Sequence, residues 1–296
     1  MFKGSLVALA TPFDSDNRVD YVSLKALIEF HVSAGTDGLV IAGTTGEAAT
    51  LTKPEHEELI ARAVEIVAGR MPVIAGTGSN STQQTIDLSL AVAGSGIDAY
   101  LIVVPYYNKP MQEGMVGHFS AIADAVDKPV MMYNVPGRTV ADMQADTVGR
   151  LAKHGNIFGI KEATGDIDRL RAIKALVDND FMLYSGDDFT ALEFLKNGGH
   201  GIVTVTGNVV PGAIARLCKL AAEGEFEQAR ALDETLQALN NALFVESNPI
   251  PVKWALHQMG LMSPNLRLPL TDYAEQYHQQ MRTALTIAGV KLENAA

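Results

Sequence analysis

A lysine ends a run of apolar residues in the segment IFGIKEATGD, residues 157–166. Burying its charge is costly unless the charge is paired, so Lys161 needs a reason to be there. Burial favours the neutral amine, which can attack a carbonyl carbon and form a Schiff base. The protonated imine is an electron sink, and the neighbouring carbon then loses a proton readily. The alternative is a structural lysine paired with Glu162 or another carboxylate.

Tyrosines end two other apolar runs. Tyr133 closes PVMMY, and Tyr106 and Tyr107 follow AYLIVVP. A phenol beside an imine can move protons to and from the substrate. The alternative for each tyrosine is a packed ring whose hydroxyl has a backbone partner.

Two threonines and an arginine could hold carboxylates. Thr44 and Thr45 lie in GTTGE, where glycines allow close approach of a ligand to the backbone. A threonine that caps the next helix is the alternative. Arg138 follows NVPG, and its guanidinium suits bidentate binding of a carboxylate, unless it is an ordinary surface arginine.

These side chains need a scaffold that brings them together, and the chain shows a repeated pattern that supplies one. Short apolar runs alternate with stretches of helical periodicity, which predicts parallel strands connected by helices. Eight such units predict a (β/α)8 TIM barrel, whose active site lies at the carboxyl ends of the strands. An open doubly wound sheet is the alternative, but no nucleotide fingerprint follows the first run. The expected strands are residues 5–10, 38–42, 72–76, 99–104, 129–133, 157–161, 181–185 and 201–205.

The strand pattern stops after the eighth run. We therefore expect a barrel domain over 1–224 and a helical region over 225–296 that packs on it.

Composition excludes several classes of function. The net charge is −11 and no basic run occurs, which argues against nucleic acid and anionic membranes as partners. No apolar stretch reaches the roughly 18 residues of a membrane span, and the first residues do not resemble a signal peptide, so we expect a cytoplasmic protein. Cys218, the only cysteine, is expected to be a packed core thiol.

Metal chemistry has little support in the sequence. The seven histidines show no ligand spacing, so no metal is expected. Asp187 and Asp188 precede a helical stretch and are interpreted as residues that cap or begin it.

Taken together, the strand-end motifs resemble the dihydrodipicolinate synthase family of pyruvate-dependent class I aldolases, over residues 3–290. The family implies condensation of pyruvate with aspartate semialdehyde in lysine and diaminopimelate biosynthesis, with no metal or organic cofactor. It also implies a homotetramer built from two tight dimers. The motifs are GTTGEAATL, GTGSNST, PYYNKP, YNVPGRT, GIKEATGD, YSGDD and ESNPIPVKWAL.

The resemblance also implies catalytic roles. Lys161 would form the Schiff base with pyruvate, and Tyr133 would be the proton shuttle. Thr44 would link Tyr133 to Tyr107 in a hydrogen-bonded relay, with Tyr107 supplied by a neighbouring subunit.

Substrate-binding roles are implied in the same way. Thr45 would hold the pyruvate carboxylate, and Arg138 would bind the carboxylate of aspartate semialdehyde. Gly186 and the backbone of Val203 would line the pocket.

Many members of the family are inhibited by lysine at a dimer interface, and this chain departs from their pattern twice. Gln84 replaces a common glutamate, and Lys53 adds a positive charge where histidine is frequent. Both changes disfavour a cationic ligand with two ammonium groups and one carboxylate, so weak or absent inhibition is expected. The matching positions are Ala48, Ala49, Lys53, His56, Asn80, Gln84 and Tyr106.

Two other functions remain open at this point. Another pyruvate aldolase, such as N-acetylneuraminate lyase, would use the same lysine and tyrosine. Arg138 argues against it, since the resemblance implies that the sialic acid lyases lack this arginine. A catalytically silent ligand-binding barrel is the second alternative.

Overall fold

Eight parallel strands form a closed barrel in the computed structural model, which describes residues 2–292. Neighbours in the barrel are neighbours in the chain, and β1 pairs with β8 to close it. The predicted (β/α)8 fold is confirmed, because every expected apolar run contains a strand. The strands are β1 Gly4–Ala8, β2 Gly38–Ile41, β3 Val73–Gly76, β4 Ala99–Val103, β5 Val130–Asn134, β6 Ile157–Glu162, β7 Met182–Ser185 and β8 Gly201–Thr204.

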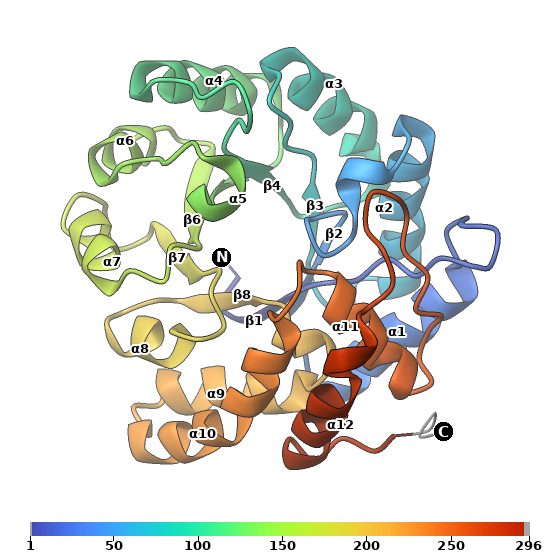
Figure 1. Ribbon diagram of the computed structural model, residues 1–296. Coiled ribbons are helices and arrows are strands. Elements are labelled where there is room, and N and C mark those ends of the chain that lie inside the picture. Colours follow the sequence, from blue (N-terminus) through green and yellow to red (C-terminus); the bar gives the residue numbers. More distant parts are fainter. Residues whose placement is uncertain (1, 293–296) are drawn as a thin grey trace.

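Helices surround the strands on all sides (Figure 1). Several begin with a side-chain cap; Thr52 and Glu55, for example, form a reciprocal capping box at the start of α2. The surrounding helices are α1 Tyr21–Ala34, α2 Lys53–Val67, α3 Thr82–Val92, α4 Gln112–Ala125, α6 Ala145–Leu151, α7 Ile167–Lys174, α8 Ala191–Lys196 and α9 Pro211–Ala222. A short additional helix, α5 Pro136–Thr139, follows β5, and four 3-10 turns are η1 Ala48–Thr50, η2 Ala93–Ser95, η3 Thr206–Asn208 and η4 Glu275–Tyr277.

The strands separate two apolar cores. Successive side chains of a strand point to opposite faces, so one set fills the barrel and the other packs under the helices. On β5, for example, Met131 and Tyr133 lie in the inner cluster, whereas Val130 and Met132 lie in the outer one.

Strand β6 contains one residue more than its partner. Val130 pairs with Ile157, but the next residue, Met131, pairs with Gly159. Phe158, the extra residue, belongs to the inner cluster. Strict alternation from Phe158 would turn Lys161 outward, and the bulge reverses the alternation so that Lys161 points inward.

A glycine is required beside this bulge. A Cβ atom on Gly159 would lie 2.4 Å from the carbonyl oxygen of Met182 on β7. Only a residue without a side chain allows the two strands to approach this closely.

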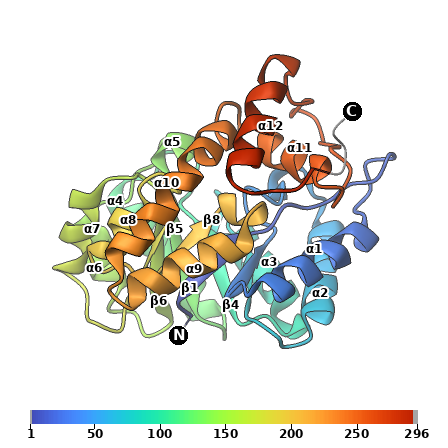
Figure 2. The same cartoon turned by 90° about the horizontal axis from the view of Figure 1, so that it is seen from below.

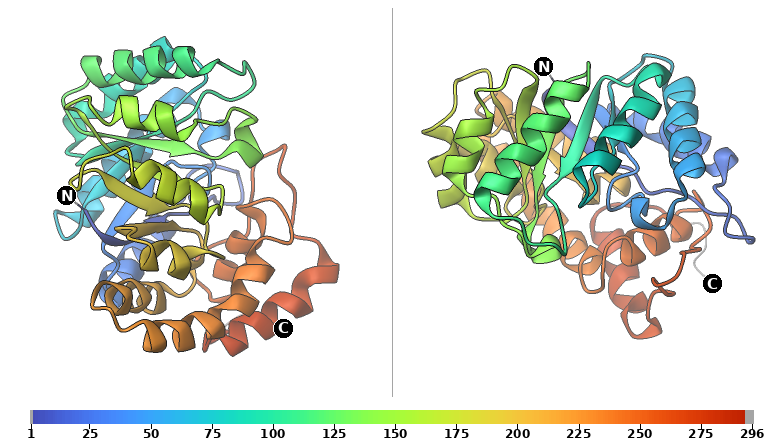
Figure 3. Two further views of the ribbon diagram at one scale, coloured as in Figure 1. Left: turned by 90° about the vertical axis from the view of Figure 1, so that its left-hand side faces the viewer. Right: turned by 90° about the horizontal axis from the view of Figure 1, so that it is seen from above.

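Three helices follow the barrel: α10 Phe226–Leu243, α11 Ile250–Gln258 and α12 His278–Ile287. α10 packs against α8 and α9, and α12 packs against α10 and α11. Figure 2 shows α11 and α12 at one end of the barrel and the N-terminus at the other. Figures 2 and 3 place the short helix α5 at the same end as α11. The division into a barrel and a helical region after residue 224 stays a prediction.

None of the helices within residues 2–292 combines the length and apolar character needed to cross a membrane.

Candidate active site

Lys161 and Tyr133 face each other inside the carboxyl end of the barrel. They are register partners on β6 and β5, and Nζ of Lys161 lies 4.1 Å from the centre of the Tyr133 ring. Lys161 is 5% exposed and Tyr133 6%. The structure therefore brings together the two residues to which the sequence assigned imine formation and proton transfer.

Glu162 does not pair with Lys161. Its side chain turns to the opposite side of β6, where Oε2 accepts from Asn134 Nδ2 at 3.0 Å and Oε1 accepts from the Thr164 backbone N–H at 2.8 Å. No ion pair of Lys161 is found anywhere in residues 2–292. The structural pairing considered for this lysine is thus not observed.

Gly186 makes room for the lysine side chain. A Cβ atom at this position would lie 2.7 Å from Lys161 Cε. Val203 on β8 is buried in the same inner cluster as Tyr133. Both predicted lining residues therefore occupy strand ends that face the barrel interior.

Thr45 and Arg138 are connected by a residue that the sequence reasoning missed. Asn248 donates from Nδ2 to Thr45 Oγ1 at 3.0 Å, and its backbone oxygen accepts from Arg138 Nη2 at 3.3 Å. The buried Oδ1 of Asn248 has no partner within the described chain, so a ligand could supply a donor. Its segment, ESNPIPVKWAL, was noted as a motif, but it follows no strand.

A buried ion pair connects the GTTGE loop to α11. Glu47 has a left-handed backbone, with φ of 53°, and its Oε1 lies 2.5 Å from Nζ of the fully buried Lys253 on α11. Burial lowers the pKa of Lys253 to about 8, against the opposing effect of Glu47. Glu47 Oε2 also accepts from the backbone N–H of Arg267 at 3.1 Å. The loop that carries Thr44 is therefore fixed by α11 and by the segment that follows it.

Comparison with known proteins identifies the family. Residues 1–288 match the family model of the dihydrodipicolinate synthetase family. The chain belongs to this family. It is 54% identical to a 4-hydroxy-tetrahydrodipicolinate synthase of Pseudomonas syringae pv. syringae, over 98% of this chain and 99% of that one. It is 53% identical to the synthase of Methylococcus capsulatus, over 98% and 100%.

A solved structure of the family has the same fold. The chloride-inhibited dihydrodipicolinate synthase from Acinetobacter baumannii, complexed with pyruvate, superposes with a TM-score of 0.97. It is 48% identical and covers 98% of this chain and 100% of its own. The predicted family is confirmed, and these relatives support the synthase rather than N-acetylneuraminate lyase.

Tyr107 points into solvent and does not contact Lys161 of the same chain. It is 88% exposed, and its backbone is left-handed, with φ of 73°. No hydrogen bond joins Tyr107, Thr44 and Tyr133 within residues 2–292. Thr44 is half-buried and does not cap α2, because the N-cap of that helix is Thr52. The relay that the family implies is not formed by a single chain.

The predicted regulatory positions lie just after β2, β3 and β4. His56 is buried, with Nε2 2.7 Å from the carbonyl oxygen of Gly76, and burial lowers its pKa. Lys53 Nζ lies 3.9 Å from Glu57, and Tyr106 is exposed. The other positions, in the same loops and first helical turns, are Ala48, Ala49, Asn80 and Gln84.

One interpretation of the acidic residues after β7 is wrong. Asp187 does accept from the backbone and hydroxyl of Thr190, before α8. Asp188 instead accepts from the backbone N–H groups of Val205 and Thr206, so it joins the end of β7 to the end of β8. Burial raises its pKa.

Two further sequence expectations concern cysteine and metal. Cys218 is buried, as expected of a packed core thiol. The described part of the chain contains no group of three His, Cys, Asp or Glu side chains that could hold a metal ion.

Proposed function

We propose that this enzyme joins pyruvate to aspartate semialdehyde through an imine on Lys161 and gives 4-hydroxy-tetrahydrodipicolinate. The observation that carries the proposal is the buried lysine itself. It faces Tyr133 in the barrel, packs closely against Gly186 and has no carboxylate partner in residues 2–292. Such an amine is available to a carbonyl substrate rather than committed to an ion pair.

The first half of the reaction takes place on pyruvate. Nζ of Lys161 attacks the keto carbon, and the carbonyl oxygen leaves as water after proton transfers in which Tyr133 takes part. Loss of a methyl proton from the imine then gives an enamine. Thr45, whose hydroxyl is positioned by the bond from Asn248 Nδ2, and Thr44 beside it would hold the pyruvate carboxylate.

The second half uses the enamine as a carbon nucleophile. Its terminal carbon attacks the aldehyde carbon of the semialdehyde, and the new alkoxide takes up a proton. The amino group of the same substrate then attacks the imine carbon, closes the ring and releases Lys161. Arg138 would bind the substrate carboxylate, and it is exposed at the end of the barrel where α5 lies.

Borohydride reduction tests the covalent step. With pyruvate and borohydride, the enzyme should lose activity, and peptide mapping should find the adduct on Lys161, because reduction makes the imine bond permanent. The Lys161→Arg variant, which keeps the charge, is the control. An adduct on another lysine, or none, would overturn the proposal. Formation of the adduct without condensation of the two substrates would instead indicate a silent pyruvate-binding protein.

A neighbouring subunit would complete the site. Tyr107 is held outward by a strained backbone, which suits a residue that inserts into a second copy. We expect a tetramer made of two dimers. Mixing Tyr107→Phe with Lys161→Ala subunits should restore part of the activity, because a hybrid dimer contains one intact site. Proven subunit exchange without recovery would contradict a shared site.

Inhibition by lysine is expected to be weak. Gln84 has no charge to offer an ammonium group, and it accepts from Ser79 Oγ at 3.2 Å. Lys53 adds a like charge, which Glu57 offsets at 3.9 Å. A dose–response curve measures this, and strong inhibition at micromolar lysine would contradict the charge argument. The cytoplasm, where amino-acid biosynthesis takes place, is the compartment we propose for the reaction.

A further inference from the structure

The residues that follow the Lys161–Tyr133 pair are also joined to each other. Glu162 and Asn134 are the next register partners on β6 and β5, and they point away from the barrel interior. Both are buried, and Asn134 is 0% exposed. Asn134 Nδ2 donates to Glu162 Oε2 at 3.0 Å. Behind the inward pair, a side-chain hydrogen bond therefore connects the same two strands.

The amide of Asn134 has further partners. Nδ2 also donates to Asp142 Oδ1 at 3.0 Å, and Oδ1 accepts from the backbone N–H of Met143 at 2.9 Å. These two bonds close the loop 134–143 on itself. Arg138 lies in the middle of this loop, on α5.

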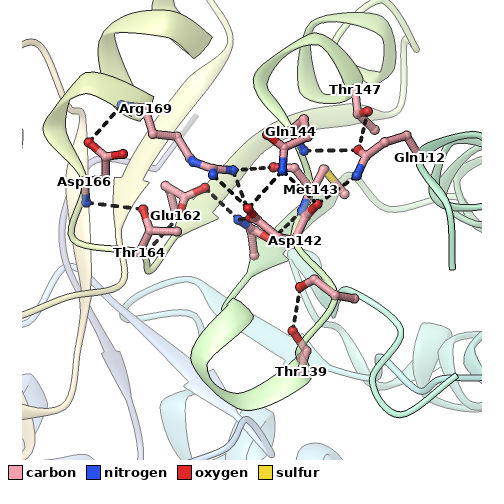
Figure 4. Close-up of polar contacts among 12 residues, drawn as sticks. Gln112, Thr139, Asp142, Met143, Gln144, Thr147, Glu162, Thr164, Asp166 and Arg169 are labelled. Atoms are coloured by element: carbon pink, nitrogen blue, oxygen red, sulfur yellow. Dashed lines mark hydrogen bonds and ion pairs between the residues drawn. The ribbon is translucent and has the colours of Figure 1, made fainter. Parts of the chain in front are cut away.

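The far end of this loop is anchored by charge. Arg169 of α7 donates to both carboxylate oxygens of Asp142, at 2.9 and 2.8 Å. Gln144 donates to Asp142 Oδ2 at 2.9 Å, and Gln112 donates to its backbone oxygen at 2.8 Å. Figure 4 shows these side chains converging on Asp142 from three segments. Burial alone would raise the pKa of Asp142, but the bonds from Asn134 and Arg169 outweigh it and lower the pKa.

Glu162 is held on its other side as well. Oε1 accepts from the Thr164 backbone N–H at 2.8 Å, at the start of the loop that leads into α7. Beyond Glu162, the backbone link between these strand ends is the bond from Ala163 N–H to the Asn134 oxygen, at 3.0 Å. The side-chain bonds of Asn134 thus reinforce the sheet where its ladder ends.

We propose that Asn134 is a positioning residue of the reaction. Through Glu162 it sets Lys161 relative to Tyr133, and by closing the loop 134–143 it sets Arg138 for the second substrate. The inference rests on the proposed function, because that function assigns the roles of these three residues.

Residue chemistry restricts this position. Asparagine supplies two N–H donors and one acceptor on a short side chain, and all three are used here. Aspartate would place an oxygen against two carboxylates. Alanine would leave Glu162 Oε2 and the Met143 N–H without their partner, and Asp142 Oδ1 would keep only its bond from Arg169. A displacement of about 1 Å in a reacting group can cost on the order of 100-fold in rate.

The experiment compares two asparagines at opposite ends of the β5–β6 pair: Asn134 at the carboxyl end and Asn156 at the amino end. Asn134→Ala removes the link at the carboxyl end. Asn156→Ala is the matched control at the amino end, where Nδ2 donates to the carbonyl oxygens of Ala123, Val126 and Lys128. For each variant, we would measure the rate of borohydride-trapped imine formation, kcat, KM for both substrates, and Tm.

Asn134→Ala should slow imine formation by roughly 10- to 100-fold and raise KM for aspartate semialdehyde. Asn156→Ala should lower Tm but leave the imine rate within about twofold of wild type, since its bonds lie far from the reacting atoms.

Asn134→Asp adds a pH signature that a purely structural role would not give. Its new carboxylate faces those of Glu162 and Asp142, and Arg169 is the cation nearby. Its activity relative to wild type should rise as the pH falls from about 8 to about 6, because one of the three carboxyls then takes up a proton.

Any of three results would overturn the inference. The first is a rate of imine formation in Asn134→Ala equal to that in Asn156→Ala, and the second is an unchanged KM of Asn134→Ala for aspartate semialdehyde. The third is an activity of Asn134→Asp, relative to wild type, that does not change with pH. If Asn134→Ala does not fold, Glu162→Gln takes its place, because it keeps the volume and loses one of two acceptors; an unchanged imine rate in that variant is equally decisive. A wild-type enzyme without an adduct on Lys161 would overturn the proposed function instead.

Discussion

Lys161 and Lys253 are both buried near the carboxyl end of the barrel, yet their surroundings differ. Lys253 is fully enclosed, with Glu47 Oε1 2.5 Å from its Nζ and the ring of Phe13 at 4.2 Å. Lys161 lies over the Tyr133 ring, beside the space left by Gly186. In the structure over residues 2–292, it has no carboxylate partner.

The difference separates a structural lysine from a reactive one. An amine held by a carboxylate in a closed site has neither a free lone pair nor room for a substrate. An amine that faces the ring of a tyrosine and has no carboxylate partner can lose its proton and attack a carbonyl carbon. In both segments, GIKEA and PVKWA, the lysine directly follows a β-branched apolar residue, so the distinction depends on the partners in space.

The largest effect is expected at the unpaired lysine. Lys161→Ala should lower kcat/KM by about 1,000-fold or more, because no other described amine can form the imine in the barrel. Lys161→Arg should be equally inactive, since it keeps the charge but not the nucleophile. Steady-state kinetics measures both. Near-normal activity in either variant would mean that the two lysines have been assigned the wrong roles.

The next effect is on stability. Lys253→Met leaves the carboxylate of Glu47 buried without its partner, which should lower the free energy of unfolding by about 3–5 kcal/mol. Urea unfolding measures the loss. The borohydride adduct should still form on Lys161, although more slowly, because the GTTGE loop loses its support.

A second substitution sharpens this prediction. The Glu47→Gln/Lys253→Met double variant should be more stable than Lys253→Met alone, because no uncompensated charge remains. Additive losses in the double-mutant cycle would contradict the ion pair as the source of the effect.

The smallest expected effect is a pH-dependent change in the free energy of unfolding, and it concerns the same loop. Arg267, whose backbone binds Glu47, also donates from its guanidinium to Glu55 and lowers the pKa of that carboxyl from 4.5 to about 2. Between these values the unfolded chain binds more protons, so stability should fall as the pH falls. Glu55→Gln should cost about 1–2 kcal/mol near neutral pH, discounted for partial exposure, and almost nothing near pH 2.

A matched control lies on the same helix. Glu57→Gln changes a more exposed carboxylate, 3.9 Å from Lys53, and should cost less than about 1 kcal/mol at any pH. A pH-independent loss in Glu55→Gln would mean that its pairing with Arg267 does not stabilise the loop.

The barrel and its reactive lysine could be predicted because their signals are local. Each strand is a short apolar run, and Lys161 directly follows one of them. Asn248, by contrast, contacts Thr45 across 203 positions of sequence, and Lys253 contacts Glu47 across 206. No pattern along the chain encodes such a pair. Asp188 was misinterpreted for the same reason, because its partners come from the next strand rather than from the helix that follows it.

The bulge in β6 determines which residues of this strand point into the barrel. Side chains alternate between two environments, and the extra residue at Phe158 shifts every later position to the other one. If the same residues paired with β5 without the bulge, Glu162 would point into the barrel and Lys161 would lie under the helices. Lys161 would still be present in the chain, but its amine could not contact a substrate in the barrel. The pairing register of β6 is thus as much a determinant of this active site as the identity of its residues.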